Sequence, residues 1–282
     1  MVRQSRAPLL FRLAKFMERH RIRGWHRVHT AVHHSGLLDR EVVYDIAPGV
    51  RLIIPMHLSP AYRFFDRQFI EEYEDDLIAC LAAGAAGLPA PVTLVDVGAD
   101  IGVFSAKLAV RVPALRRVVA FEPNPVVGGY LDRNLGALPV QTETHHCALS
   151  DFDGQGELRE PAPTGRRAAD GEIAVRTLDS FGLESAGGLV LKVDVEGGEL
   201  GVVLGARETL RRAPAFVISV EAHPEVYRRT GIDPLECVRV IREVRDCQVT
   251  ISEAPDHPLD IDRNFFEQDH SGEIRNLVCR CV

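Results

Sequence analysis

The stretch that decides the fold reads Thr93-Leu94-Val95-Asp96-Val97-Gly98-Ala99-Asp100-Ile101-Gly102-Val103-Phe104. Its apolar run predicts a buried strand, its glycines a tight turn, and its last residues the start of a helix. A turn of this kind directs backbone N–H groups and a carboxylate into one crevice. The stretch therefore predicts a ligand site at the end of a strand, with Asp96 in it.

Beyond this stretch, strands and helices are predicted to alternate. Apolar runs predict strands near residues 93–97, 117–122, 143–148, 189–194, 215–221, 247–252 and 276–281. Helical periodicity predicts helices near residues 102–111, 125–136, 198–211 and 233–244. The alternation indicates an α/β domain with a mostly parallel sheet and right-handed crossovers. Glycines and prolines predict loops over residues 151–172, and polar residues a connection over 254–275.

The N-terminal part differs from the rest. Residues 1–38 are rich in arginine and contain only one acid, Glu18. Their apolar residues recur at helical spacing, which favours a basic helix packed on the domain over one lying on an anionic membrane. A hairpin is predicted over residues 41–55 and a helix over 68–86. We therefore expect an N-terminal extension over residues 1–66 and a ligand-binding domain over 67–282.

Composition excludes several classes of protein. The chain has 282 residues, 46% of them hydrophobic, which is enough for one sizeable core. Its net charge of −7 does not indicate a nucleic-acid binder. Its six cysteines form no C-x-x-C motif, which argues against a zinc site or a disulfide scaffold and favours a reducing, cytoplasmic location. The uncharged run over residues 77–95 is interrupted by glycine and proline, so we do not expect a membrane span.

Acids or histidine follow five consecutive predicted strands. They are Asp96, Glu122, Asp151, Asp194 with Glu196, and Glu221 with His223. Ligands of open α/β sheets bind at these carboxyl ends. Glu122, at the end of the second strand, can hold both hydroxyls of a ribose. Asp100 in the glycine turn repels a pyrophosphate and favours a cationic ligand. S-adenosylmethionine, which carries an ammonium, a sulfonium and a ribose, fits this combination.

The order of these motifs resembles the FkbM-type family of S-adenosylmethionine-dependent methyltransferases over roughly residues 65–245. The motifs are Asp96-Val97-Gly98-Ala99-Asp100-Ile101-Gly102, Phe121-Glu122-Pro123-Asn124, Ala148-Leu149-Ser150-Asp151, Leu191-Lys192-Val193-Asp194-Val195-Glu196-Gly197-Gly198-Glu199 and Glu221-Ala222-His223. The Lys-x-Asp-x-Glu-Gly segment is the most specific of them. The family more often has Asn at position 100. The resemblance implies a class I methyltransferase sheet, Rossmann-like and mostly parallel, with an antiparallel last strand and helices on both faces.

The resemblance also implies cofactor-binding residues and a reaction. They are Asp96, Gly98, Asp100 and Gly102 in the turn, Glu122, Pro123 and Asn124 at the ribose, Ser150 and Asp151 beside the adenine, and Asp194 beside the methionine moiety. Members mostly methylate hydroxyl oxygens, often on sugars or glycosylated natural products. We therefore expect an O-methyltransferase with a small-molecule or glycan acceptor and no nucleic-acid partner.

The candidate catalytic residues are Asp194, His223 and Glu196. His223 could accept the proton of the substrate hydroxyl or could instead cap a loop. Glu196 could assist or could cap the next helix. Lys192, inside a strand, favours a buried ion pair over a substrate contact. A divalent metal ion on Asp194, Glu196, Glu221 and His223 is an alternative that the spacing does not favour.

Two other classes of protein stay open as alternatives. One is an oxidoreductase with a nucleotide cofactor, against which the missing G-x-G-x-x-G pattern and Asp100 both argue. The other is a protein with a non-catalytic fold that contacts the inner membrane surface through residues 1–38. The sequence carries no signal for an oligomeric state.

Overall fold

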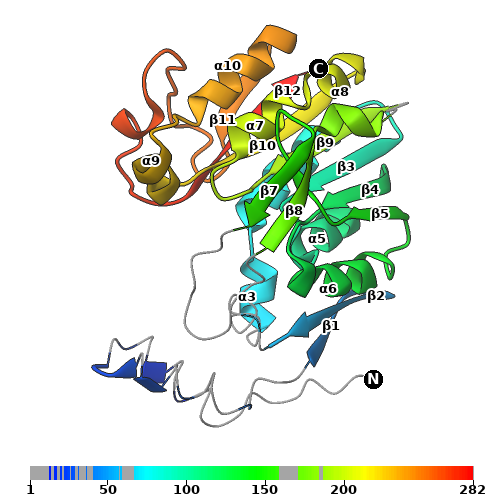
Figure 1. The fold of residues 1–282 in the computed structure, drawn as a ribbon, viewed down its shortest axis with the longest axis vertical. Coiled ribbons are helices and arrows are strands. Elements are labelled where there is room, and N and C mark those ends of the chain that lie inside the picture. The colour runs from blue at the N-terminus through cyan, green and yellow to red at the C-terminus, as the bar shows by residue number, and fades with distance from the viewer. Residues whose placement is uncertain are drawn as a thin grey trace.

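A seven-stranded sheet forms the centre of the molecule (Figure 1). The computed structural model describes residues 41–56, 67–158, 171–183 and 187–281, with Leu58 and isolated residues between 13 and 36. The strand order is β11-β12-β10-β9-β3-β4-β5. The strands are β3 (Val92–Val97), β4 (Leu115–Phe121), β5 (Gln141–His145), β9 (Gly188–Val193), β10 (Phe216–Ala222), β11 (Gln248–Ile251) and β12 (Arg275–Cys281).

The directions of the strands confirm the predicted fold class. Strands β5, β4, β3, β9 and β10 are paired in parallel, whereas β12 runs antiparallel to both β10 and β11. The sheet is therefore mostly parallel with an antiparallel last strand. All carboxyl ends of the parallel strands meet at one edge, which is where the predicted site residues lie.

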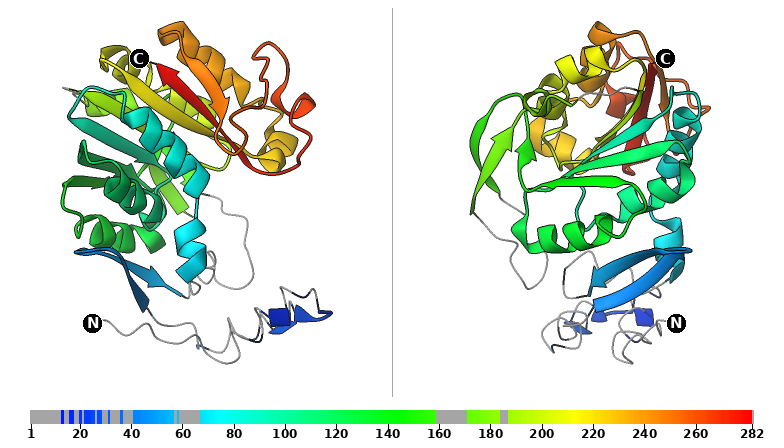
Figure 2. Two further views of the ribbon diagram at one scale, coloured as in Figure 1. Left: turned by 180° about the vertical axis from the view of Figure 1, so that it is seen from behind. Right: turned by 90° about the vertical axis from the view of Figure 1, so that its right-hand side faces the viewer.

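Helices cover both faces of the sheet (Figures 1 and 2). Helices α4, α5 and α6 belong to one hydrophobic layer and α7, α8 and α10 to the other. Consecutive strand residues alternate between the layers, so that Val118 packs in the first and Val119 in the second. The helices are α3 (Arg67–Glu72), α4 (Asp75–Ala85), α5 (Val103–Arg111), α6 (Pro125–Leu135), α7 (Glu199–Leu204), α8 (Arg207–Arg212), α9 (Pro224–Thr230) and α10 (Leu235–Val244), with short 3₁₀ turns at η2 (Leu178–Phe181) and η3 (Phe265–Glu267).

The predicted hairpin is present and packs on the domain. Strands β1 (Glu41–Ala47) and β2 (Val50–Pro55) are antiparallel, with Gly49 in the left-handed conformation at the turn. Leu52 and Ile54 are fully buried in the layer of α4, α5 and α6. The side chain of Asn134 on α6 accepts from the N–H of Ile53 at 2.7 Å and donates to its carbonyl at 3.0 Å. A division of the chain at residue 66 stays a prediction.

Two predicted helices are each broken in two. The helix predicted over 68–86 is α3 and α4, separated at Tyr73 and Glu74. The helix predicted over 198–211 is α7 and α8, separated at Gly205 and Ala206. A Cβ at Gly205 would lie 2.0 Å from the carbonyl oxygen of Ser150, so this break lets two distant backbones touch. Both breaks depend on residues far away in the sequence, which periodicity does not reveal.

The prediction of a loop over residues 151–172 is wrong in part. A small second sheet, in the order β6-β8-β7, contains strands on both sides of residues 159–170, which lie outside the described part of the chain. Its strands are β6 (Ala148–Leu149), β7 (Gly154–Leu158) and β8 (Gly171–Arg176). The strand predicted over 143–148 therefore ends at His145, and its last residue belongs to the second sheet. Gly154 and Gly156, which helped to indicate a loop, lie on β7, and β7 pairs antiparallel with β8.

The structure also pairs Cys247 with Cys281 in a disulfide, which the sequence analysis did not favour. Cys247 precedes β11 and Cys281 ends β12, and these strands are neighbours, with Gln248 opposite Arg280. The two cysteines are 34 residues apart in the sequence, so spacing alone hides the pair. Within the described ranges, no helix has both the length and the apolar character that a membrane crossing requires. The predicted basic helix over residues 1–38 lies largely outside those ranges.

Candidate active site

The glycine turn after β3 touches the end of β9. Gly98 is left-handed, with φ 82°, and a Cβ there would lie 1.8 Å from the carbonyl oxygen of Asp194. Only glycine allows this approach. The N–H groups of Gly98 and Ala99 donate to the carbonyl of Phe121, at 3.0 and 3.1 Å. The turn is thereby held between the ends of β4 and β9.

The second half of the turn is organised around Glu122. Asp100 is left-handed, with φ 48°, a conformation that Asn and Asp adopt more readily than other side chains. Its N–H donates to Oε2 of Glu122 at 3.0 Å, and the N–H of Asn124 donates to Oε1 at 2.8 Å. Gly102, with φ 83°, precedes α5. Two backbone donors thus fix the carboxylate of Glu122, which is 9% exposed, at the end of β4.

The residues that follow Glu122 begin α6. Asn124 caps this helix, because its Oδ1 accepts from the N–H of Val126 at 2.9 Å. Pro123 lies between Glu122 and the cap, and Pro125 is the first residue of the helix. Asn124 therefore supports the site through its backbone N–H and through the start of α6.

A buried lysine lies at the centre of the sheet edge. Lys192, 3% exposed, is paired in register with Asp96 of β3 and donates to Oδ2 of Asp194 at 2.7 Å. Its Nζ also lies 5.1 Å from the centroid of the Phe104 ring. Burial lowers the pKa of Lys192, but the carboxylates of Asp194, Glu74 and Asp96 outweigh burial and raise it well above the ordinary value. The expected buried ion pair is present.

Asp96 is the most deeply buried acid of the site. It is 0% exposed, and its Oδ2 accepts from the hydroxyl of Ser105 at 2.6 Å. Its Oδ1 has no hydrogen-bond partner among the residues that the structure describes. Burial raises the pKa of Asp96, while Lys192 opposes this increase. The site therefore contains a buried acceptor that a ligand could satisfy.

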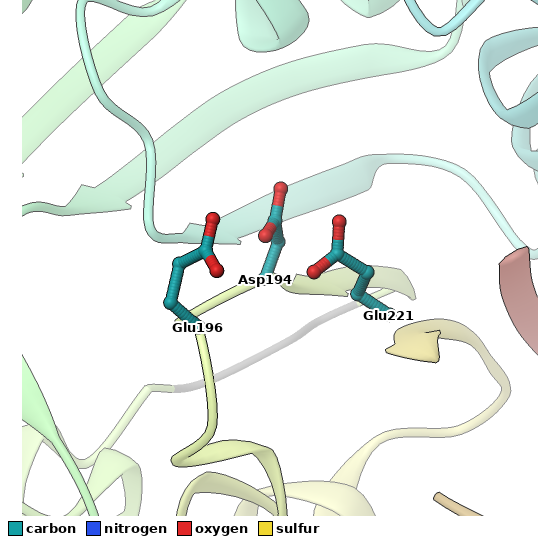
Figure 3. A group of neighbouring side chains, drawn as sticks. All are labelled: Asp194, Glu196 and Glu221. Atoms are coloured by element: carbon teal, nitrogen blue, oxygen red, sulfur yellow. The ribbon is translucent and has the colours of Figure 1, made fainter. Parts of the chain in front are cut away.

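Three carboxylates lie close together at the ends of β9 and β10 (Figure 3). Asp194, Glu196 and Glu221 each offer an oxygen within 4.8 Å of the others. Burial, followed by the charges of Asp194 and Glu196, raises the pKa of Glu221 to about 9. His223 does not belong to this group. The three acids could hold a hard cation with their oxygens.

Glu199, rather than Glu196, supports the start of α7. Its Oε1 accepts from the N–H groups of Gly197 and Val195, at 2.9 and 3.3 Å. Glu196 itself is left-handed, with φ 58°, and its side chain is exposed. The capping role considered for Glu196 is therefore not observed, because α7 begins after Gly198 without a side-chain cap, and Glu199, which the sequence analysis did not single out, holds the preceding loop.

His223 begins α9, a helix that the sequence analysis missed. Its Nδ1 accepts from the N–H of Glu225 at 3.0 Å, which makes it the N-terminal cap. In the neutral ring, this geometry assigns the proton to Nε2. His223 also lines a small pocket with Glu221 and Tyr227. A role as general base would therefore compete with the cap for the same nitrogen.

Ser150 and Asp151 follow β6 in the second sheet. The N–H of Ser150 donates to the carbonyl of Arg176 at 2.9 Å, and its hydroxyl donates to Asp151 at 3.2 Å. A Cβ at Gly201 on α7 would lie 2.7 Å from the Ser150 hydroxyl. These contacts place the pair against α7, and the adenine contact expected of them stays a prediction.

Two more residues of the site escaped the sequence analysis. Tyr73 and Glu74 lie at the break between α3 and α4, where the charges of Lys192 and Asp194 act on both. The run Glu74-Asp75-Asp76 inside a predicted helix was the available signal, because acids gather where a helix begins.

The sheet order, the antiparallel β12 and the acids at the strand ends define a Rossmann-like domain of the class I methyltransferase type. The cofactor of such a domain is S-adenosyl-L-methionine. A model of the methyltransferase FkbM domain matches residues 96–281, and the chain belongs to this family.

Individual relatives cover about half of the chain. It is 27% identical over 159 residues to the hexuronic acid methyltransferase AglP of Haloferax volcanii, covering 53% of this chain and 61% of that protein. It is 33% identical over 157 residues to the AMB antimetabolite synthetase AmbE of Pseudomonas aeruginosa, covering 52% of this chain and 7% of that protein. A solved structure of geranyl diphosphate methyltransferase with S-adenosylmethionine is 12% identical, covers 79% of this chain and 90% of its own, and has a TM-score of 0.43.

Proposed function

We propose that this protein is an S-adenosylmethionine-dependent O-methyltransferase that acts on a hydroxyl of a sugar, a glycolipid or a glycosylated natural product. The observation that carries the proposal is the convergence of Asp96, Glu122 and Asp194 at adjoining strand ends around the turn at Gly98. Membership in the FkbM family supports the same activity.

The residues at the sheet edge fit the proposed cofactor. S-adenosylmethionine carries an ammonium and a sulfonium, and Asp96 and Asp194 supply negative charge for them. Glu122 is held by two N–H groups, one on each carboxylate oxygen, at the strand end where a ribose is expected. The left-handed turn at Gly98 and Asp100 lies between the strand ends that carry Asp96 and Glu122, and the methionine end is expected beside it. When bound, the cofactor supplies an electrophilic methyl group.

The chain's own residues would orient the two reactants and receive a proton. Methyl transfer to a hydroxyl forms the C–O bond, breaks the S–C bond and releases the hydroxyl proton. Asp194, Glu196 and His223 are the candidate acceptors of that proton. Burial raises the pKa of Glu221 to about 9, so Glu221 already holds a proton at neutral pH and is not proposed as an acceptor.

The acceptor class is supported by one relative. The name of AglP states that it methylates a hexuronic acid, which is a sugar acid. Because the similarity covers 61% of AglP, a sugar acceptor for this chain is part of our proposal. We place the methyl acceptor beside Glu196, and call this part of the site the acceptor side. Arg229, whose guanidinium donates to the carbonyl of Glu196, brings positive charge to it.

The test has a binding step and a transfer step. Titration calorimetry should detect binding of S-adenosylmethionine and of its product S-adenosylhomocysteine. A screen with methyl-labelled cofactor should then transfer label to free uronic acids or glycans, and the label should survive base treatment that hydrolyses methyl esters. If neither nucleoside binds, the proposed activity is contradicted. If base treatment removes the label from the product, transfer to a hydroxyl is contradicted.

A further inference from the structure

The break between α3 and α4 is held from the neighbouring helix. Nζ of Lys107 on α5 donates to the carbonyls of Glu71 and Tyr73, at 3.0 and 2.5 Å. It also lies 3.6 Å from Asp75 and is 8% exposed. These carbonyls are therefore fixed in place by a buried cation from the helix that follows the glycine turn. The break is therefore stabilised by specific hydrogen bonds to its backbone carbonyls.

Glu74, at this break, combines two unfavourable features. Its backbone is left-handed, with φ 50° and ψ 31°, which is uncommon for a side chain of this kind. Its Oε2 is buried and lacks a hydrogen-bond partner within the described part of the chain. A buried carboxylate oxygen without a donor destabilises the folded state. Such features persist where they serve a site.

The charges around Glu74 indicate what it faces. The groups that act on it from β3 and β9 are Lys192, Asp194 and Asp96, and Tyr73 hydrogen-bonds its carboxylate. Burial raises the pKa of Glu74, and Lys192 opposes the increase. Lys192 already donates to Asp194 at 2.7 Å. The charges of three carboxylates therefore act on one ammonium, an excess of negative charge that a further cationic donor would balance.

We propose that Oε2 of Glu74 accepts a hydrogen bond from the ammonium group of the methionine moiety of bound S-adenosylmethionine. This inference rests on the proposed function. The sulfonium carries no hydrogen to donate, and the carboxylate of the cofactor is repelled by Glu74. The ribose is expected at Glu122 beyond β4, whereas Glu74 faces β3 and β9. The family match begins at residue 96, so it does not include Glu74.

The test compares two nucleosides that differ at the proposed contact. S-adenosylhomocysteine carries the amino and carboxyl groups, and 5′-methylthioadenosine shares the adenosine and sulfur but lacks both. In calorimetry, Glu74→Gln should weaken binding of S-adenosylhomocysteine about tenfold or more, because a charge-assisted hydrogen bond is lost. Its affinity for 5′-methylthioadenosine should stay within about twofold of wild type, within the usual spread for a distant change.

Control variants separate contact from fold. Glu72→Gln changes an exposed acid in the same segment and should bind both nucleosides as wild type does. Glu74→Asp keeps the charge but shortens the side chain by one methylene, and should show the same selective loss if Glu74→Gln fails to fold. Thermal melting of each variant checks the fold.

Each remaining outcome is decisive. If Glu74→Gln weakens the binding of both nucleosides equally, Glu74 has a purely structural role and the inference is overturned. Unchanged affinity for both also overturns it, and lowered turnover in that case would place Glu74 on the acceptor side. A wild-type protein that binds neither nucleoside contradicts the proposed function itself, which is a separate result.

Discussion

At the scale of single residues, the site depends on carboxylates whose orientation the backbone fixes. Glu122 accepts from the N–H groups of Asp100 and Asn124, so its position is set before a ligand arrives. Preorganised acceptors of this kind lose no orientation on binding. Glu122→Ala should therefore weaken binding of S-adenosylhomocysteine about tenfold or more in calorimetry. Glu143→Ala, which removes an acid paired with Arg117 on the neighbouring strand, is the control, and equal affinities of wild type and Glu122→Ala would contradict the assignment.

Glu221 should give the protein a characteristic dependence of stability on pH. Its pKa is raised from 4.5 to about 9, chiefly by burial, so the folded state holds a proton that the unfolded chain releases. The stability from this group is complete below pH 4.5 and is lost as the pH rises toward 9. Melting temperatures of wild type should therefore fall more between pH 6 and about 9 than those of Glu221→Gln. Glu236→Gln, at an exposed pair with Arg239, should follow wild type, and parallel curves for all three would refute the shift.

At the scale of elements, His223 can be tested as the cap of α9. His223→Ala removes the acceptor for the N–H of Glu225 and should lower the free energy of unfolding by about 1 kcal/mol. His223→Asn offers a side-chain oxygen in the same place and should retain that stability. Urea unfolding measures both. Turnover of the Asn variant then decides the catalytic question, because Asn caps a helix but does not accept a proton as imidazole does.

The break between α3 and α4 makes a second prediction at this scale. Lys107→Met keeps much of the side-chain volume but leaves the carbonyls of Glu71 and Tyr73 without their donor. It should lower the free energy of unfolding by about 1–3 kcal/mol and weaken binding of S-adenosylhomocysteine. Arg111→Met, which removes a partly exposed partner of Asp75, should do neither. Unchanged urea unfolding of Lys107→Met would show that the hydrogen bonds from Lys107 do not support the break.

The same elements show what the sequence could predict. Periodicity and glycine spacing predicted the hairpin, the seven strands of the sheet and the turn at Gly98, because those signals are local. The breaks at Glu74 and Gly205 were not predicted, because they depend on Lys107 and Ser150. The strand-end acids were found because a parallel sheet gathers its carboxyl ends. Glu74 was missed because it reaches that edge from outside the sheet.

At the scale of the whole molecule, ligand binding should stabilise the folded protein. A ligand that binds only the folded state adds about 2.7 kcal/mol at a concentration one hundred times its Kd. S-adenosylhomocysteine should therefore raise the melting temperature of the full chain in a concentration-dependent manner. NAD should not, because Asp100 lies in the turn where a pyrophosphate would bind. Stabilisation by NAD alone would favour an oxidoreductase instead.

The contact between Gly98 and Asp194 joins the turn after β3 to the loop after β9. A methyl group at position 98 would overlap the carbonyl of Asp194, so the two backbones are in direct contact with no side chain between them. A movement of Asp194 toward Gly98 must therefore also displace the turn after β3. Binding of the acceptor would then change the affinity for the methyl donor. Thermodynamic reciprocity requires that binding of the donor change the affinity for the acceptor by the same factor.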